Sequence, residues 1–319
     1  MSALNNLKLT LSASPHITAP ISTTSVMANV IGALVPAAAV GVYVFGLQAL
    51  WLMLATVAAC VAGEAFCCWA SGRRQTIGDL SAVVTGLLLA FNLPVSAPLW
   101  LGVVGGLFAI IIVKFLFGGI GQNIVNPALA ARAALLASWP TYMTAFTLDG
   151  VSTATPLGML HGGGAYAAAN MPSLTQLFLG NVAGCLGETS ALALLLGGLY
   201  LIWRGVISWR VPVIYLATVA LLTTLIGRGE LLSGNGLYEI LAGGMMLGAF
   251  FMATDYTTCP IAPKGQIIFA LGCGFLTSII RLYGGYAEGV SYSILIMNLF
   301  TPLIDKVTKP KIFGEVKKG

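Results

Sequence analysis

Charged side chains are scarce in this chain. Of its 319 residues only 8% are Asp, Glu, Lys or Arg, and 58% are apolar, whereas a typical soluble domain is about 25% charged. This composition excludes a soluble globular protein. Because the apolar residues fall in long blocks rather than in the alternating pattern of membrane barrel strands, the sequence predicts an all-α polytopic membrane protein.

The chain also lacks the motifs of an enzyme that handles soluble redox substrates by itself. It contains no G-x-G-x-x-G stretch and no Walker loop, and its six cysteines include no C-x-x-C pair. Dinucleotide binding, iron–sulfur ligation and a metal site are therefore not predicted. We expect the cysteines to be small apolar residues within or near helices. We do not expect a nucleic acid as a partner.

About ten membrane-spanning segments are expected from runs of roughly 20 apolar residues, with shorter ones where helices are broken. Two of them end at the Pro-containing loops NLPVSAP and CPIAPKG, where proline lacks the amide donor that a helix needs. The expected spans are residues 26–46, 47–69, 76–91, 98–117, 123–139, 176–203, 209–227, 236–253, 266–283 and 289–305.

The two halves of the chain are alike. Each passes from a short span, through a Pro loop, to a long span that ends in Gly-Gly, which predicts two inverted five-helix repeats with broken helices. The expected segments are a cytoplasmic N-terminal segment at 1–25, the first repeat at 26–139, an external loop at 140–175, the second repeat at 176–305 and a basic cytoplasmic tail at 306–319.

Basic residues set the expected orientation. Apart from Arg132, which lies inside a span, the segments on one side of the membrane hold all the Lys and Arg residues except Arg228 and Arg281. Cytoplasmic loops carry such an excess, so both termini are expected in the cytoplasm. The loop at 140–175 has no Lys or Arg and is expected outside.

Arg132 is a charged residue within an expected span, and two acidic residues within other spans are candidate partners for it. Arg132 lies well inside the fifth span, where a charge costs at least ~2.5–3.5 kcal/mol, so it needs a partner. Glu188, near the outer end of the sixth span, and Glu64, within the second, are the candidates. One interpretation is a structural Arg–Glu pair between helices. The other is that Arg132 faces an anionic cofactor and Glu188 an ion or proton path.

Asn123 and Asn126 stand where a helix is expected to begin, in GGIGQNIVNPAL, with Pro127 in its first turn. Their side chains are expected to satisfy backbone amides freed at that helix start. The triplet Asn126-Pro127-Ala128 also occurs in aquaporins. Aquaporins use two such triplets that face each other and this chain has one, so we disfavour that interpretation.

The polar stretch LDGVSTATPLGML, at residues 148–160, interrupts the apolar chain. Thr155 before Pro156 is the pattern of an N-cap hydroxyl and a first helical residue. Residues 149–155, DGVSTAT, also look like the target motif of bacterial flavin transferases, D-G-x-[ST]-x-A-T, in which the last Thr receives FMN as a phosphoester. Thr153 stands where glycine is frequent in that motif. A phosphate on Thr155 is expected to lie at a helix N-terminus, which favours negative charge.

Five stretches together resemble one family across nearly the whole chain. They are GGIGQNIVNPAL, DGVSTATPLG, GETS, IRLYGGYAEGVSYSILIMN and PLIDKVTKPKIFGE. The chain resembles RnfD of the Rnf ion-translocating ferredoxin:NAD oxidoreductase complex. It is more distantly similar to NqrB of the Na-translocating NADH:quinone reductase, which usually has a longer cytoplasmic N-terminal region.

The resemblance implies a multi-pass flavoprotein of the bacterial inner membrane. It is one link in a chain of flavins and iron–sulfur centres from ferredoxin to NAD, coupled to Na⁺ or H⁺ movement, and it is not active alone. The implied cofactor is FMN, covalently bound to Thr155 on the external side, and riboflavin is a candidate second flavin. The residues assigned to cofactor binding are Asp149, Ser152, Thr153, Ala154, Thr155, Arg132, Asn123, Asn126, Glu188 and Thr189.

The implied partners are the other Rnf proteins RnfA, RnfB, RnfC, RnfE and RnfG, above all the external, flavin-carrying RnfG, together with a flavin transferase and membrane lipid. Two alternatives stay open. An inverted repeat also suits a urea- or ammonium-type channel or transporter without redox chemistry, although a pore has no use for a flavin transferase motif. The other alternative is a scaffold protein of the complex whose modification motif is vestigial.

Overall fold

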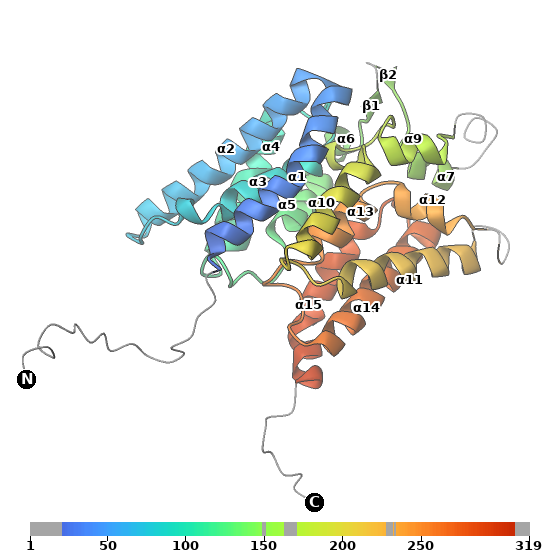
Figure 1. Ribbon diagram of the computed structural model, residues 1–319. Helices are drawn as coiled ribbons and strands as arrows, with labels where there is room; N and C mark the ends of the chain where they lie inside the picture. The colour runs from blue at the N-terminus through green and yellow to red at the C-terminus, as the bar shows by residue number, and fades with distance from the viewer. Residues whose placement is uncertain (1–20, 149–150, 163–170, 228–231, 233, 310–319) are drawn as a thin grey trace, which may run out of the picture.

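The computed structural model describes residues 21–148, 151–162, 171–227, 232 and 234–309 (Figure 1). Their regular secondary structure is helical apart from one short hairpin. The first half contains α1 (Thr23–Phe45), α2 (Leu47–Ala70), η1 (Ile77–Asp79), α3 (Ser81–Phe91), α4 (Leu99–Leu107), which continues as the π-helix η2 (Phe108–Phe115), and α5 (Pro127–Ser138).

A connecting region follows, with α6 (Pro140–Met143), β1 (Thr147–Leu148), β2 (Val151–Ser152), α7 (Pro156–Gly162) and α9 (Leu174–Leu179). The two strands pair antiparallel, Thr147 opposite Ser152 and Leu148 opposite Val151. The second half contains η3 (Leu186–Glu188), α10 (Ala191–Trp203), α11 (Arg210–Ile226), α12 (Gly236–Leu241), α13 (Met245–Leu247), the π-helix η4 (Gly248–Met252), α14 (Pro263–Tyr283) and α15 (Val290–Thr308).

Four helices among the described residues are long and apolar enough to cross a membrane, namely α1, α2, α14 and α15. Shorter apolar helices accompany them in both halves. Large apolar side chains on these helices face outward, for example Tyr43 at 91%, Trp203 at 79% and Trp69 at 74% exposure. Such a surface fits a lipid environment rather than water. The predicted all-α membrane class is confirmed, and the number of ten spans stays a prediction.

The sixth expected span, residues 176–203, is wrong as a continuous helix. α9 ends at Leu179, and its C-cap residue, Gly180, has a left-handed φ of 112°. A side chain there would approach the Thr189 carbonyl oxygen to 2.7 Å, so glycine is required for this turn. α10 begins only at Ala191, where the Ser190 hydroxyl accepts a hydrogen bond from Ala193 N at 3.2 Å.

The eighth expected span, residues 236–253, is broken as well. α12 ends at Leu241, and helical structure resumes with α13 at Met245. Gly243, at φ 69°, stands in the break. The predicted ends of the first, second, fourth and seventh spans agree with the structure within a few residues.

The broken segments from the two halves meet in the middle of the molecule. Leu186 N donates to Leu93 O at 3.2 Å, and Pro94 and Cys185 form an isolated antiparallel bridge. Asn92, just after α3, donates from Nδ2 to Leu88 O at 2.6 Å. Non-helical backbone at membrane depth must be satisfied within the protein, and these hydrogen bonds satisfy it.

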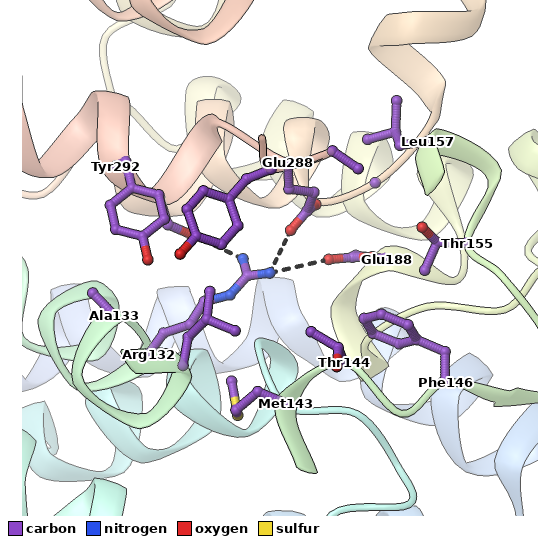
Figure 2. Close-up of a pocket in the computed structure, with 15 residues that line it drawn as sticks. Arg132, Ala133, Met143, Thr144, Phe146, Thr155, Leu157, Glu188, Glu288 and Tyr292 are labelled. Atoms are coloured by element: carbon purple, nitrogen blue, oxygen red, sulfur yellow. Dashed lines mark hydrogen bonds and ion pairs between the residues drawn. The ribbon is translucent and has the colours of Figure 1, made fainter. Parts of the chain in front are cut away.

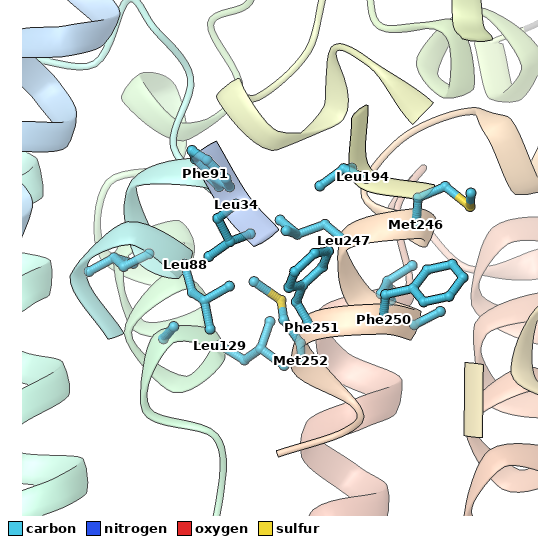
Figure 3. Close-up of a cluster of buried hydrophobic side chains, with 14 of the residues drawn as sticks. Leu34, Leu88, Phe91, Leu129, Leu194, Met246, Leu247, Phe250, Phe251 and Met252 are labelled. Carbon is cyan, nitrogen blue, oxygen red and sulfur yellow. The ribbon is translucent and has the colours of Figure 1, made fainter. Parts of the chain in front are cut away.

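A buried apolar cluster joins the halves around these breaks (Figure 3). Leu34 of α1 and Phe91 of α3 lie beside Leu247 and Phe251 from α13 and η4. α1 also packs against α10, and α5 against α15, across the halves. The start of α1 and the end of α15 lie on one side of the molecule, and the hairpin and α7 lie on the opposite side (Figure 1).

Candidate functional site

Arg132 lies on α5, and the cap of that helix fixes its position. Asn126 Oδ1 accepts hydrogen bonds from Ala128 N at 3.0 Å and Leu129 N at 3.3 Å, the capping that the sequence predicts. Asn126 Nδ2 donates to Met252 O at 3.3 Å in the other half of the chain. Anchored in this way, α5 directs Arg132 into the protein, with 11% of its side chain exposed.

Groups from both halves surround the Arg132 guanidinium. Its Nη1 donates to Asn92 Oδ1 at 3.0 Å and to Ser291 Oγ at 2.8 Å. Its Nη2 donates to Glu288 Oε2, and Glu188 Oε1 lies 3.6 Å from the same nitrogen. A buried guanidinium needs such compensation, and here it receives two carboxylates.

Backbone amides hold both carboxylates in place. Glu288 Oε1 accepts a hydrogen bond from Gly244 N at 2.5 Å, and Glu188 Oε2 accepts one from Cys185 N at 3.3 Å. Glu288 stands in the loop between α14 and α15. Burial raises the pKa of the Glu288 carboxyl, but the Arg132 guanidinium, together with the Gly244 amide and other neighbours, lowers it by more, so the pKa lies well below its ordinary value. Glu288 is therefore ionised at neutral pH.

A cavity opens beside this cluster (Figure 2). It measures about 120 Å³ and opens toward solvent. The rings of Phe146, Tyr286 and Tyr292 line it beside Arg132. The two tyrosine rings are 5.5 Å apart between centroids and inclined by 32°. The cavity thus combines aromatic walls with charged groups at one end.

Thr155 lines the same cavity from the side of α7. Its Oγ1 accepts a hydrogen bond from Gly158 N at 3.1 Å, which confirms the N-cap predicted from the Thr-Pro pattern. In the view of Figure 2, the Glu188 carboxylate lies between the Thr155 hydroxyl and the Arg132 guanidinium. Three residues singled out from the sequence, Thr155, Arg132 and Glu188, are therefore brought together at one cavity.

The other residues of the predicted modification motif lie along the hairpin. Asp149 falls outside the described residues, and Ser152 ends β2. Thr153 Oγ1 donates to Val151 O at 3.2 Å, and Ala154 is exposed. Neither Thr153 nor Ala154 lines the cavity.

Thr189, also assigned to cofactor binding, is buried and donates from Oγ1 to Leu186 O at 2.9 Å. It does not line the cavity of Thr155. This hydrogen bond closes the turn of η3, the short helix that carries Glu188. Thr189 therefore supports the turn that carries Glu188 and does not itself face the cavity.

Asn123 and Asn126 line a different cavity, of about 490 Å³, on the side of the molecule where α1 begins. Its other polar lining residues include Lys114, Asp255 and Thr257. The sequence assigned both asparagines to cofactor binding together with Arg132, which does not line this cavity. Successive turns of α5 lead from one cavity to the other, so that grouping is not what the fold produces.

Glu64 is not a partner of Arg132. Its Oε2 lies 3.0 Å from Lys114 Nζ, and its Oε1 accepts a hydrogen bond from Thr76 Oγ1 at 2.6 Å. Of the two acidic candidates from the sequence, only Glu188 lies near the guanidinium, and the closer carboxylate is Glu288. Glu288 lies within the stretch IRLYGGYAEGVSYSILIMN, where its position beside glycines at the start of a span was the available signal.

Residues 10–314 match the model of the NQR2, RnfD, RnfE family. Three curated relatives match nearly end to end. One from Acetobacterium woodii, named as the D component of a Na(+)-translocating ferredoxin:NAD(+) oxidoreductase complex, is 57% identical over 98% of both chains. One from Clostridium ljungdahlii, named as the D component of the corresponding proton-translocating complex, is 46% identical over 96% of both. One from Halorhodospira halophila, named as the D component of an ion-translocating oxidoreductase complex, is 40% identical over 97% of this chain and 96% of the relative.

Proposed function

The chain belongs to the NQR2, RnfD, RnfE family, and on that premise we propose that it relays electrons within a membrane-bound ferredoxin:NAD oxidoreductase complex through FMN esterified to Thr155. Its relatives bear the names of components of such complexes, which translocate Na⁺ or H⁺. The observation that carries the proposal is that Thr155 opens onto the cavity of Arg132. A channel or transporter without redox chemistry finds no support in the family.

The residues around Thr155 fit a flavin. Phe146, Tyr286 and Tyr292 present aromatic surface for a planar ring system, and Arg132 supplies a cation. Thr155 lines the cavity, so a group attached to its Oγ1 can reach into the cavity directly. FMN supplies one-electron chemistry at such a site.

This chain's own residues would then have three tasks. Thr155 fixes the cofactor by a covalent bond, so that it is not lost to the solvent. The aromatic side chains exclude water from the ring. Arg132, with its two carboxylates, sets the local charge, which tunes the potential of a bound redox group. A threonine hydroxyl is a poor nucleophile, so a separate flavin transferase has to form the phosphoester.

The remaining expectations belong to the same proposal. The halves form inverted repeats of five spans each, the termini are cytoplasmic, and Thr155 faces outward beneath the flavin-carrying RnfG. α1 begins on one side of the molecule and the hairpin lies on the opposite side, which supports this orientation (Figure 1). RnfA, RnfB, RnfC and RnfE complete the complex, because the described chain carries no cluster of metal-ligating side chains for an iron–sulfur centre.

A second flavin, riboflavin, is assigned to the cavity of Asn123 and Asn126. That cavity, of about 490 Å³, is large enough for a three-ring system, and its amides can pair with a flavin's polar edge. It lies on the side opposite Thr155. Two sites on opposite sides would let electrons cross the membrane within one protein chain.

The decisive experiment is the intact mass of the protein, co-expressed with a flavin transferase. The wild type should exceed its sequence mass by one FMN less water, and the denatured band should fluoresce under ultraviolet light. Thr155→Ala should remove both signals, while Thr147→Ala, on β1 outside the motif, should keep them. An unmodified wild type from that host would refute the assignment of covalent FMN.

A further inference from the structure

Two carboxylates share one guanidinium at the cavity of Thr155. Glu288 accepts a hydrogen bond from Arg132 Nη2 directly, and Glu188 Oε1 lies 3.6 Å from the same nitrogen. The side chains are 11% exposed for Arg132, 6% for Glu188 and 19% for Glu288. The cation that lines the cavity is therefore covered by two carboxyl groups from the other half of the chain.

A backbone amide holds each carboxylate in place independently of Arg132. Gly244 N donates to Glu288 Oε1 at 2.5 Å. A side chain at Gly244 would approach that same oxygen to 3.1 Å, and one at Gly243 to 2.7 Å, so the chain leaves room for the carboxylate by using glycine twice. Glu188 has its own amide donor, Cys185 N at 3.3 Å. Backbone amides that hold an anion keep it in place even when its cation is drawn elsewhere.

This arrangement affects any redox group in the cavity. Adding an electron to a flavin ring creates negative charge, which an uncovered guanidinium would stabilise. Here the guanidinium is already paired with Glu288, so it stabilises negative charge on the ring less than a free guanidinium would. Interactions between charges are strong in a buried site because screening by water is weak. Reduction is therefore disfavoured relative to a cavity that contains arginine alone.

We propose that Glu288, with Glu188 as the weaker partner, keeps the reduction potential of the cofactor on Thr155 low by holding Arg132. The inference rests on the proposed function, and Glu288 acts as a positioning residue through the guanidinium. The redox step is the transfer of one electron from a reduced one-electron donor to the ring. The donor is oxidised, the ring is reduced, and no bond forms or breaks at Glu288.

The test is a spectroelectrochemical titration of the purified flavin-bearing chain. Glu288→Gln keeps the shape of the side chain and removes its charge. It should favour the reduced flavin at least tenfold in the one-electron equilibrium, a rise in midpoint potential of about 59 mV. Glu188→Gln should give a smaller rise, because its oxygen lies farther from the guanidinium. Asp305→Asn, which removes a carboxylate that bonds Ile261 N outside the cavity, should leave the potential unchanged.

A double variant separates this role from a general effect of charge or of stability. In an Arg132→Met background the guanidinium is absent. The double variant Arg132→Met/Glu288→Gln should therefore have nearly the same midpoint potential as Arg132→Met alone. A rise that persists without Arg132 would overturn the proposal, and so would an unchanged or lowered potential in Glu288→Gln. If Glu288→Gln does not fold, Glu188→Gln is measured in its place. A rise in its midpoint potential would support the proposal, and an unchanged or lowered potential would overturn it. A chain without FMN by intact mass refutes the proposed function instead, so the two failures are distinguishable.

Discussion

Lys114 Nζ contacts both carboxylate oxygens of Glu64, at 3.2 and 3.0 Å, and donates to Ser81 Oγ at 2.6 Å. The two charged side chains are 6% and 5% exposed. Lys114 stands in the last turn of the π-helix η2, and Glu64 on α2. The pair therefore ties two helices of the first half together by charge in a region where water does not compete.

Removing one member of this pair should be more harmful than removing both. Lys114→Met leaves Glu64 buried without a cation, and we expect a loss of about 3–5 kcal/mol in the free energy of unfolding. Lys114→Met/Glu64→Gln should recover most of that loss. Denaturant titration of the detergent-solubilised protein gives both values. Equal stability of the single and double variants would contradict a paired charge.

Arg132 should behave in the same way on the other side of the molecule. Arg132→Met leaves two carboxylates uncompensated, and we expect it to fold poorly or to lose about 3–5 kcal/mol of stability. Adding Glu188→Gln and Glu288→Gln should restore folding, whereas adding Glu64→Gln, which changes a carboxylate that belongs to Lys114, should not. Thermal melting followed by tryptophan fluorescence measures the series. Rescue by Glu64→Gln would show that the partners are assigned wrongly.

α1 and α10 pack closely because residue 197, on α10, is a glycine. A methyl group at Gly197 would lie inside the van der Waals radius of the Ala33 carbonyl oxygen, whereas one at Gly32 would meet nothing within 4 Å. Gly197→Ala should therefore destabilise the protein by about 1–3 kcal/mol, a typical penalty for overpacking. Gly32→Ala, on the neighbouring residue of α1, is the matched control and should leave the melting temperature unchanged. A tolerated Gly197→Ala would mean that the two helices can separate freely.

The orientation proposed for the hairpin can be tested by labelling. Val151 is 65% exposed on β2, and Ile261 is 85% exposed in the loop before α14. In a background with Cys259→Ser, Val151→Cys should react with a membrane-impermeant maleimide in right-side-out vesicles, and Ile261→Cys should react only after the membrane is opened. The reverse pattern would place Thr155 in the cytoplasm.

The chain should be inactive on its own. Purified without partners, it should show flavin absorbance and oxidise neither NADH nor reduced ferredoxin, because it lacks dinucleotide-binding and iron–sulfur motifs. Addition of the remaining members of the complex should restore turnover. Steady oxidation of either donor by the isolated chain would contradict its role as a relay.

Local sequence features predicted much of this protein. Long apolar runs predicted α1 and α2 within a few residues, and the Pro-containing loop NLPVSAP marked where α3 ends. Such features depend on neighbouring residues: a run of apolar side chains favours a helix in lipid, and proline removes a helical hydrogen bond. The N-caps formed by Asn126 and Thr155 were readable for the same reason, since a cap involves residues only two or three positions apart.

What the sequence alone determined was the membrane class, most helix ends, the caps and the family that its motifs resemble. Only the tertiary structure decided the partners of buried charges and the membership of each cavity. Glu288 meets Arg132 across 156 residues, and Glu64 meets Lys114 across 50. The break at residues 180–190 was hidden as well, because apolar composition is the same for a helix and for irregular backbone whose hydrogen bonds, such as Leu186 N to Leu93 O, come from the other half. The physical reason is that a buried charge or a freed amide needs some partner, and helix packing, not sequence spacing, selects which one lies within reach.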